Sequence, residues 1–203
     1  MSGAVGVLHE KLVFSRRAKT LASHLAGLIP PRSRVLDVGC GDGTIDYLIA
    51  NQSPGISIEG IDVLLRPAVK VPVRQFDGTQ IPHGDASFDV VMFVDVLHHT
   101  NDPGRLLQEG KRVGKSIVIK DHLRQGCAAG ATLRFMDWVG NARHNVALPY
   151  NYWSPAQWAS AFKTVGLRVV EMRSSLGLYP APASWIFERD LHFVGRLEPI
   201  ATL

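Results

Sequence analysis

The stretch Arg34-Val-Leu-Asp-Val-Gly-Cys-Gly-Asp-Gly43 decides the fold of this chain, because it joins a short apolar run to three alternating glycines. Its apolar half is typical of a buried parallel strand. Gly39, Gly41 and Gly43 remove the β-carbon at alternate positions of the turn that follows. We therefore expect a strand that ends at a ligand, where a nucleoside-bearing cofactor lies against bare main chain.

The glycine spacing distinguishes between two classes of cofactor-binding turn. A dinucleotide-binding turn has the spacing G-x-G-x-x-G, whose third glycine would stand where this chain has Thr44. A nicotinamide-dependent enzyme is therefore disfavoured. The pattern D-x-G-x-G-x-G, from Asp37 to Gly43, instead resembles the first motif of the class I S-adenosylmethionine-dependent methyltransferases. Within that family the chain resembles the small-molecule type, the ubiquinone- and menaquinone-biosynthesis-like enzymes of the methyltransferase type 11 branch.

This resemblance implies a fold and a cofactor. The fold is α/β: a Rossmann-like, seven-stranded, mostly parallel sheet flanked by helices, with the final strand inserted antiparallel. The cofactor is S-adenosyl-L-methionine, and the product is S-adenosyl-L-homocysteine. The residues themselves agree with this fold, since strand and helix signals alternate along the chain and imply a parallel sheet.

A second apolar run that ends in an acid marks the next expected strand, at residues 56–62. Its last residue, Asp62, lies 19 residues after Gly43, which leaves room for one helix and one strand. An ionised carboxylate at a strand end can accept hydrogen bonds from both hydroxyls of a ribose. We therefore expect Asp62 to bind the cofactor ribose. The resemblance places Val63 against the adenine ring, and the alternative for Val63 is an ordinary loop or core residue.

Two later segments complete the expected cofactor site. The resemblance implies that the acid before Gly78 meets the exocyclic amine of adenine, and that the residues after the fourth strand hold the methionine end. The residues expected to bind the cofactor are therefore Asp37, Gly39, Cys40, Gly41, Gly43, Asp62, Val63, Asp77, Gly78 and Asp95. Taken alone, the glycines could serve only a tight turn, and Asp37 could bind only neighbouring amides. Together and in this order, the motifs favour an adenosyl ligand.

Three histidines at expected strand ends are the candidates for a general base, namely His98, His99 and His122. A neutral imidazole can take a proton near physiological pH, and a base is needed only if the methyl acceptor arrives protonated. A structural histidine that caps a strand end is the alternative for each of them. We expect no metal site, because adjacent residues such as His98 and His99 diverge on a strand and no carboxylate or cysteine stands at ligand spacing.

The whole chain, residues 1–203, is expected to form a single methyltransferase domain. It begins with an N-terminal helix over residues 9–28 that Pro30 and Pro31 end. Residues 123–153 are expected to cover the substrate as an insertion. Five aromatic residues could form an apolar substrate wall or belong to the core: Phe135, Trp138, Tyr150, Tyr152 and Trp153. Asp137 and Asn141, one helical turn apart, could orient a polar substrate group or face solvent.

The amino-acid composition indicates which broad classes of protein are compatible with this chain. The chain has 203 residues, of which 46% are hydrophobic and 20% charged, with a net charge of +4. Its one locally basic stretch is expected to be solvated helix surface rather than a phosphate-binding patch, and contains Lys11, Arg16, Arg17 and Lys19. Cys40 and Cys127 form neither a disulfide framework nor a metal cluster. We expect no membrane span and no signal peptide, and hence a cytoplasmic protein.

The substrate is the least determined property. The resemblance implies a small-molecule methyl acceptor and methyl transfer by in-line displacement. Amino-methylating nucleic-acid enzymes often have an N-P-P-Y tetrapeptide after the fourth strand, where this chain has Val94-Asp-Val-Leu97. Nucleic acid is therefore disfavoured, while RNA or protein substrates stay open as alternatives. So does a non-catalytic methyltransferase-like binding module, since no catalytic residue is fixed by the sequence. We expect a monomer or a homodimer.

Overall fold

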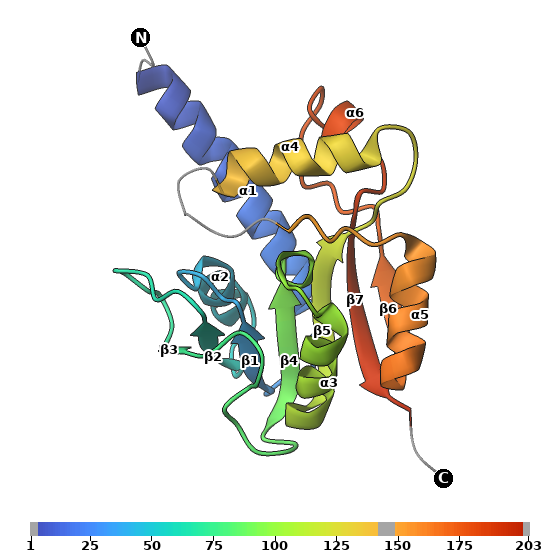
Figure 1. Cartoon of the computed structure of the whole chain (residues 1–203). Helices are drawn as coiled ribbons and strands as arrows, with labels where there is room; N and C mark the ends of the chain where they lie inside the picture. Colours follow the sequence, from blue (N-terminus) through green and yellow to red (C-terminus); the bar gives the residue numbers. More distant parts are fainter. Residues whose placement is uncertain (1–3, 142–148, 201–203) are drawn as a thin grey trace.

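The computed structural model describes residues 4–141 and 149–200, with side chains described for residues 15–139 and 149–200. Strands and helices alternate along most of the chain (Figure 1). In chain order the elements are α1 (Ala4–Ala26), β1 (Arg34–Val38), α2 (Thr44–Gln52), β2 (Ser57–Asp62), β3 (Val73–Gln75), β4 (Phe88–Val94), the 3-10 turn η1 (Leu97–His99), α3 (Pro103–Val113), β5 (Gly114–His122), α4 (Ala129–Asn141), α5 (Pro155–Val165), β6 (Leu167–Arg173), α6 (Ser184–Phe187) and β7 (His192–Pro199).

All seven strands join one sheet in the order β3-β2-β1-β4-β5-β7-β6. The pairs from β3 to β5 are parallel, and β7 runs antiparallel to both β5 and β6. The expected Rossmann-like α/β fold, with a mostly parallel seven-stranded sheet and an antiparallel final strand, is thereby confirmed. In this order β1 and β4 are neighbours at the centre, so the chain reverses its direction of winding there. Ligands of open α/β sheets bind at the carboxyl ends of the strands at such a point.

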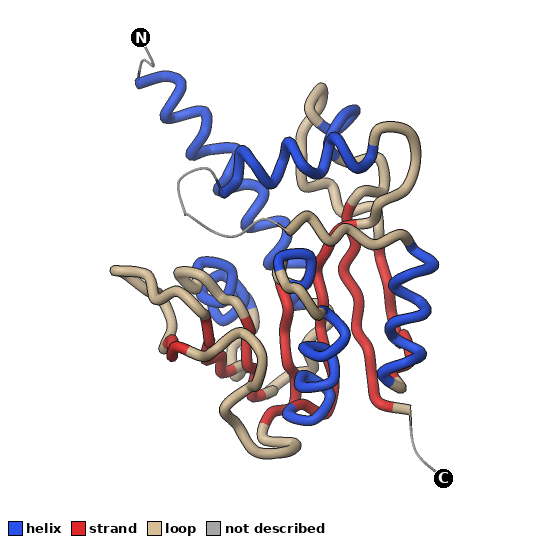
Figure 2. The backbone as a smooth tube through the Cα atoms, viewed as in Figure 1, coloured by secondary structure: helices blue, strands red, loops and turns tan. Residues whose placement is uncertain are grey.

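Helices cover both faces of the sheet (Figure 2). Side chains of β5 alternate between two buried clusters: Ile117 and Ile119 belong to the cluster that includes residues of α3 and α5, and Val118 to the cluster that includes residues of α1 and α2. Burial of both faces explains why the central strands are continuous apolar runs rather than alternating ones. Both faces of the sheet are therefore buried, and polar side chains gather at its carboxyl edge.

Two helices begin with side-chain caps that the sequence predicts. Asp102 accepts a hydrogen bond from the Arg105 amide at the start of α3. Ser154 and Gln157 form a capping box at the start of α5, and Gly166 ends that helix with a φ of 74°. Such caps satisfy amides that a helix end would otherwise leave unpaired.

The N-terminal helix differs from its predicted bounds. It begins at Ala4 rather than residue 9 and ends at Ala26. A tighter turn follows, in which the Leu28 amide bonds back to the Leu25 carbonyl. The Pro30 nitrogen, four residues after Ala26, carries no hydrogen with which to continue the helix.

The segment 123–153 contains α4, which lies with α6 above the carboxyl edge of the sheet (Figure 1). Residues 142–148 of this segment lie outside the described residues. Among the described helices, none has both the length and the apolar character needed to cross a bilayer.

Candidate functional site

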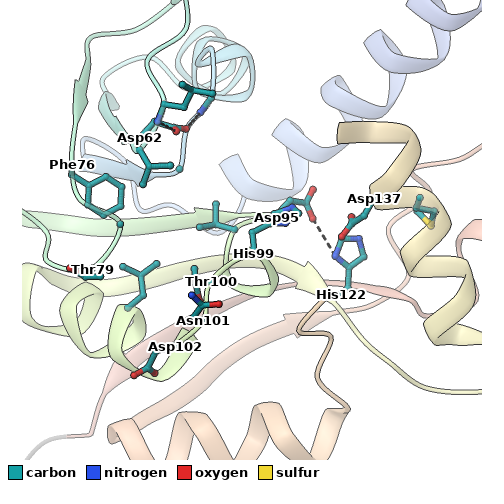
Figure 3. A pocket seen from close by; sticks show the side chains of 18 of the residues that line it. Asp62, Phe76, Thr79, Asp95, His99, Thr100, Asn101, Asp102, His122 and Asp137 are labelled. Carbon is teal, nitrogen blue, oxygen red and sulfur yellow. Dashed lines mark hydrogen bonds and ion pairs between the residues drawn. The ribbon is translucent and has the colours of Figure 1, made fainter. Parts of the chain in front are cut away.

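A cavity of about 970 Å³ lies at the carboxyl edge of the sheet. Its lining comes from the ends of β1, β2, β4 and β5 and from α1, α4 and α6. Asp62 and Phe76 lie at one end of the close view, and Asp95, His122 and Asp137 at the other (Figure 3). The cavity therefore has two ends, one beside the glycine turn and one below α4.

Asp62 occupies the end beside the glycine turn, as the sequence predicts. It is 8% exposed, and its Oδ2 accepts the Gly41 amide at 2.8 Å while its Oδ1 accepts the Leu64 amide at 2.9 Å. An ionised carboxylate offers about four lone-pair sites, so each oxygen keeps the capacity to accept one further hydrogen bond. Because Asp62 also lines the cavity, that capacity is available to a ligand with two hydroxyls.

Two of the three glycines are sterically required, and the third opens onto free space. A β-carbon on Gly39 would lie 2.5 Å from Val96 Cγ2, and one on Gly43 would lie 2.6 Å from Val71 Cγ2. Gly41 has nothing within 4 Å of its hypothetical β-carbon and lines the cavity together with Gly39. The turn therefore presents bare main chain to the cavity, as predicted.

Three of the ten predicted cofactor residues do not line the cavity: Asp37, Cys40 and Gly43. Asp37 is 2% exposed, and burial, together with the neighbouring Asp46 carboxyl, raises its pKa well above the usual value. Cys40 lies against β2, since a β-carbon on Gly60 would come within 2.3 Å of its Sγ, and burial raises the pKa of its thiol. These three residues therefore belong to the turn and its supports rather than to the cavity wall.

A second carboxylate, Asp77, faces the same end from the loop after β3. Its Oδ1 accepts the amides of Thr79 and Gln80 at 2.7 and 2.8 Å, and these hydrogen bonds lower its pKa. Gly78 and Val63 line the cavity beside it, as does Phe76, which the sequence analysis did not single out. A flat apolar group could lie between the Val63 and Phe76 side chains and present a donor to Asp77.

Asp95 lies beside His122 and Asp137 (Figure 3) and is held by two cations. Lys120 Nζ donates to its Oδ1, and Arg17 donates to its Oδ2 at 3.3 Å. Burial raises the pKa of Asp95, but Lys120 and Arg17 lower it more, so the pKa lies below its usual value and the carboxylate is ionised. Asp95 lines the cavity as predicted, with its charge already met by side chains of this chain.

The structure places His98 apart from the cavity lining. Its side chain is 1% exposed and does not line the cavity, and its Nδ1 lies 2.7 Å from Asp121 Oδ1. Although burial lowers the pKa of His98, Asp121 and Asp137 raise it to about 10. A histidine that is protonated at neutral pH cannot accept the proton of a methyl acceptor. The burial of His98 outside the cavity therefore speaks against a general-base role, and that role stays an untested prediction.

His99 and His122 both line the cavity, and the pKa of each lies below its usual value. Burial and the charge on His98 lower the pKa of His99, and its Nδ1 is buried without a hydrogen-bond partner among the described residues. Burial and the Lys120 charge lower the pKa of His122, whose Nδ1 lies 3.6 Å from Asp95 Oδ1. Each imidazole can therefore accept a proton from a group bound in the cavity.

The fold brings carboxylates to the histidines that the sequence separates from them. The ligand-type atoms of Asp95, His98 and His122 lie within 4.8 Å of one another, and so do those of His98, His99 and Asp137. Carboxylates thus do lie at ligand distance from these histidines, which the sequence spacing does not indicate. Either group would need His98 without the proton that its carboxylates stabilise, and metal binding competes with that proton. The absence of a metal site stays an untested prediction.

The end below α4 is walled mainly by apolar side chains. Phe135, Met136 and Val139 come from α4, and Tyr179 and Phe187 come from the segment around α6. Of the five aromatic residues considered from the sequence, only Phe135 lines the cavity.

The other aromatic residues of that set lie elsewhere. Trp138 is 59% exposed, Trp153 packs against Trp158, and Tyr150 and Tyr152 pack with the buried part of α4.

Asp137 lines the same end and is 7% exposed, and the Tyr152 hydroxyl donates to it. It therefore does not face solvent. The side chain of Asn141 lies outside the described residues.

Arg17 is the site residue that the sequence analysis assigned wrongly. It lines the cavity instead of belonging to a solvated helix surface, although its neighbour Arg16 is exposed. Leu21 and Leu25, four and eight residues later, are buried at 3% and 0% exposure. The spacing i, i+4, i+8 places Arg17 on the buried stripe of α1, and that periodicity could have identified it.

Comparison with known proteins gives a family match. A family model described as a methyltransferase domain matches residues 10–172. The 27-O-demethylrifamycin SV methyltransferase of Amycolatopsis mediterranei is 27% identical over 139 residues, which are 60% of this chain and 51% of that protein. The 2-methyl-6-phytyl-1,4-hydroquinone methyltransferase of Synechocystis sp. is 30% identical over 135 residues, 62% of this chain and 37% of that protein. The chain thus spans about half, or less, of the length of these relatives.

A solved structure shows the same fold. It is a chain from the complex between the Haloferax volcanii Trm112 methyltransferase activator and a protein described as a methyltransferase. The TM-score is 0.71 at 19% sequence identity, with 95% of this chain and 94% of that chain covered. At this identity the likeness concerns the fold alone.

Proposed function

This chain belongs to the methyltransferase domain family, and from that premise we propose that it transfers a methyl group from S-adenosyl-L-methionine to a small-molecule acceptor by in-line displacement. One observation carries the proposal. A single cavity holds an ionisable carboxylate with spare acceptor capacity, Asp62, beside an open glycine turn, and two neutral histidines, His99 and His122, also line it. A cofactor site and a site for proton removal therefore share one space.

The residues present fit an adenosyl cofactor. Asp62 would accept both ribose hydroxyls, because each of its oxygens makes only one hydrogen bond to the main chain. Asp77 would accept the exocyclic amine of adenine, and Val63 and Phe76 would contact the ring. Gly39 and Gly41 would let the methionine portion approach the backbone, with Asp95 facing the same space. Asp37, Cys40 and Gly43 would act by shaping the turn.

The chain's own part in the reaction is to align the acceptor and to remove its proton. S-adenosyl-L-methionine, when bound, supplies an activated methyl group on a sulfonium. Alignment of two reactants can contribute roughly 7 to 11 kcal/mol to lowering a barrier. We assign proton removal to His99, because it faces the cavity and is neutral beside the charged His98. His122 is the second candidate for the same role.

A small molecule is the acceptor class that this cavity favours. The acceptor end lies under α4 and α6, and its walls are mostly apolar. The two relatives described above are named for a demethylrifamycin and a hydroquinone, both small molecules. RNA and protein substrates stay open as the alternative. A non-catalytic binding module would have the cofactor site without turnover.

A methyl-transfer assay tests the proposal. The purified protein is incubated with methyl-labelled S-adenosyl-L-methionine and a panel of phenols, hydroquinones and amines, with bulk tRNA and an acid-soluble protein extract as separate arms. We expect label in at least one small molecule, and S-adenosyl-L-homocysteine in equal amount. Label only in tRNA or protein would show that the acceptor is a macromolecule and not a small molecule. Cofactor binding without label in any arm would support the binding module instead.

A further inference from the structure

We propose that Arg17 is an anion-binding residue of the acceptor end, so that the methyl acceptor is an aromatic or apolar molecule that carries a carboxylate or another anionic oxygen. This inference rests on the methyl-transfer function proposed above and narrows its substrate class. The first observation is the position of the guanidinium. Arg17 comes from α1 on the side of the cavity that Asp95 and Tyr179 share, away from Asp62 and Asp77.

The guanidinium of Arg17 is held in place but leaves most of its donors unused. One nitrogen donates to Asp95 Oδ2 at 3.3 Å, and the guanidinium carbon lies 5.8 Å from the centre of the Tyr179 ring. Nε is buried without a partner among the described residues. An arginine has five N–H donors in a planar fork that matches a carboxylate. With its side chain 28% exposed and lining the cavity, Arg17 can present the remaining donors to a ligand.

Arg17 shares its carboxylate with a second cation. Asp95 also receives the ammonium of Lys120, whose side chain is fully buried. Asp137 lies on the same side of the cavity, where it receives the Tyr152 hydroxyl and lies 3.4 Å from His98 Nε2. One hydrogen bond to Asp95 therefore engages Arg17, which leaves its other accessible N–H groups for a ligand.

The walls of this end define what the anion is attached to. Phe135, Met136, Tyr179 and Phe187 surround the space that Arg17 faces. An anion loses its hydration in such a space and enters only where a cation replaces that hydration. A neutral analogue of the same shape leaves the guanidinium without its partner, so the site discriminates strongly between the two. The apolar walls bind the body of the acceptor, and Arg17 selects its charge.

The test compares matched acids and amides. 2-Hydroxybenzoate and 6-hydroxy-2-naphthoate, each with its carboxamide, are titrated calorimetrically into protein saturated with S-adenosyl-L-homocysteine. We expect each acid to bind about tenfold or more tightly than its amide. Arg17→Met should abolish that preference while it leaves amide binding in place. Arg17→Lys should keep part of it, since it retains the charge without the planar fork. Arg16→Met, on the exposed neighbour, is the control and should keep the full preference.

Three results would overturn the inference: equal binding of acid and amide to the unaltered protein, an acid preference that survives Arg17→Met, or no binding of any of the four probes. Thermal unfolding of each variant shows whether α1 still packs, and Arg17→Lys keeps the test valid if Arg17→Met unfolds. Failure of the proposed function is a separate outcome, because it would appear as no label in any arm of the methyl-transfer assay or, beforehand, as no binding of S-adenosyl-L-homocysteine to the unaltered protein.

Discussion

His98 Nδ1 lies 2.7 Å from Asp121 Oδ1, and both side chains are 1% exposed. Asp121 belongs to β5 and His98 to η1, so this pair joins the turn after β4 to the neighbouring strand. Asp121 and Asp137 raise the pKa of His98, whereas burial and the charge on His98 lower the pKa of the adjacent His99. The buried pair therefore contributes to the difference between the two adjacent histidines.

Removal of one partner of this pair should lower the free energy of unfolding substantially. Asp121→Ala leaves a buried imidazolium with its main counter-charge missing, and loss of one partner of a buried ion pair costs roughly 3 to 5 kcal/mol. We expect that loss in the free energy of unfolding measured with urea at pH 7. Asp85→Ala is the matched control, since Asp85 pairs with Arg112 on the surface with its side chain 80% exposed. It should cost at most about 1 kcal/mol. Equal losses for the two variants would contradict the assignment.

The same pair gives stability a defined dependence on pH. The pKa of His98 is raised to about 10 in the folded protein, against about 6.5 in the unfolded chain. The stabilisation that its proton provides is therefore fully present below about pH 6.5 and is lost as pH rises through about 10. Urea unfolding between these values should show falling stability in the unaltered protein and a smaller fall in His98→Gln. Parallel curves for the two proteins would show that His98 is neutral in the fold.

His99→Gln should lower turnover while cofactor binding is retained. Removal of a general base typically costs about 10²- to 10⁴-fold in rate. The pKa of His99 is lowered by burial and by the charge on His98, so the acidic limb of kcat/KM should lie below pH 6.5. Kinetics with the acceptor from the panel would measure both quantities. His122→Gln is made in parallel, and a larger loss there would transfer the role to His122.

Asp62→Ala should weaken cofactor binding by roughly 1 to 3 kcal/mol, because two hydroxyls lose their acceptor on entering the cavity. Asp42→Ala is the matched control. Asp42 also accepts a backbone amide, that of Thr44, at 3.0 Å, but it does not line the cavity. Calorimetry with S-adenosyl-L-homocysteine compares the two variants. The same loss in both would mean that Asp62 acts only by holding the glycine turn through the Gly41 amide.

The cofactor end could be predicted from the sequence because its signals are local. The glycines directly follow the apolar run of β1, and an acid ends the apolar run of β2. Each pattern indicates the carboxyl end of a parallel strand. Asp62 and Gly41 are 21 residues apart and meet because β1 and β2 are adjacent and parallel. A strand-turn-helix pattern fixes that adjacency, so a residue pattern was sufficient there.

The acceptor end could not be predicted in the same way, because its contacts are distant in sequence. Arg17 and Asp95 are separated by 78 residues, and Asp137 reaches His98 from α4. Which aromatic side chains face the cavity depends on the rotation of α4. Phe135 and Val139, one turn apart, line the cavity, whereas Trp138 points outward. Packing of α1 and α4 against the sheet determines these relationships, and no local motif encodes that packing.

Calorimetric titration with S-adenosyl-L-homocysteine, with NAD as the control, tests the central claim most directly, because every assigned role depends on the adenosyl site. We predict micromolar binding of S-adenosyl-L-homocysteine, roughly −8 kcal/mol, and no binding of NAD. Absence of S-adenosyl-L-homocysteine binding by protein that unfolds cooperatively would contradict the account.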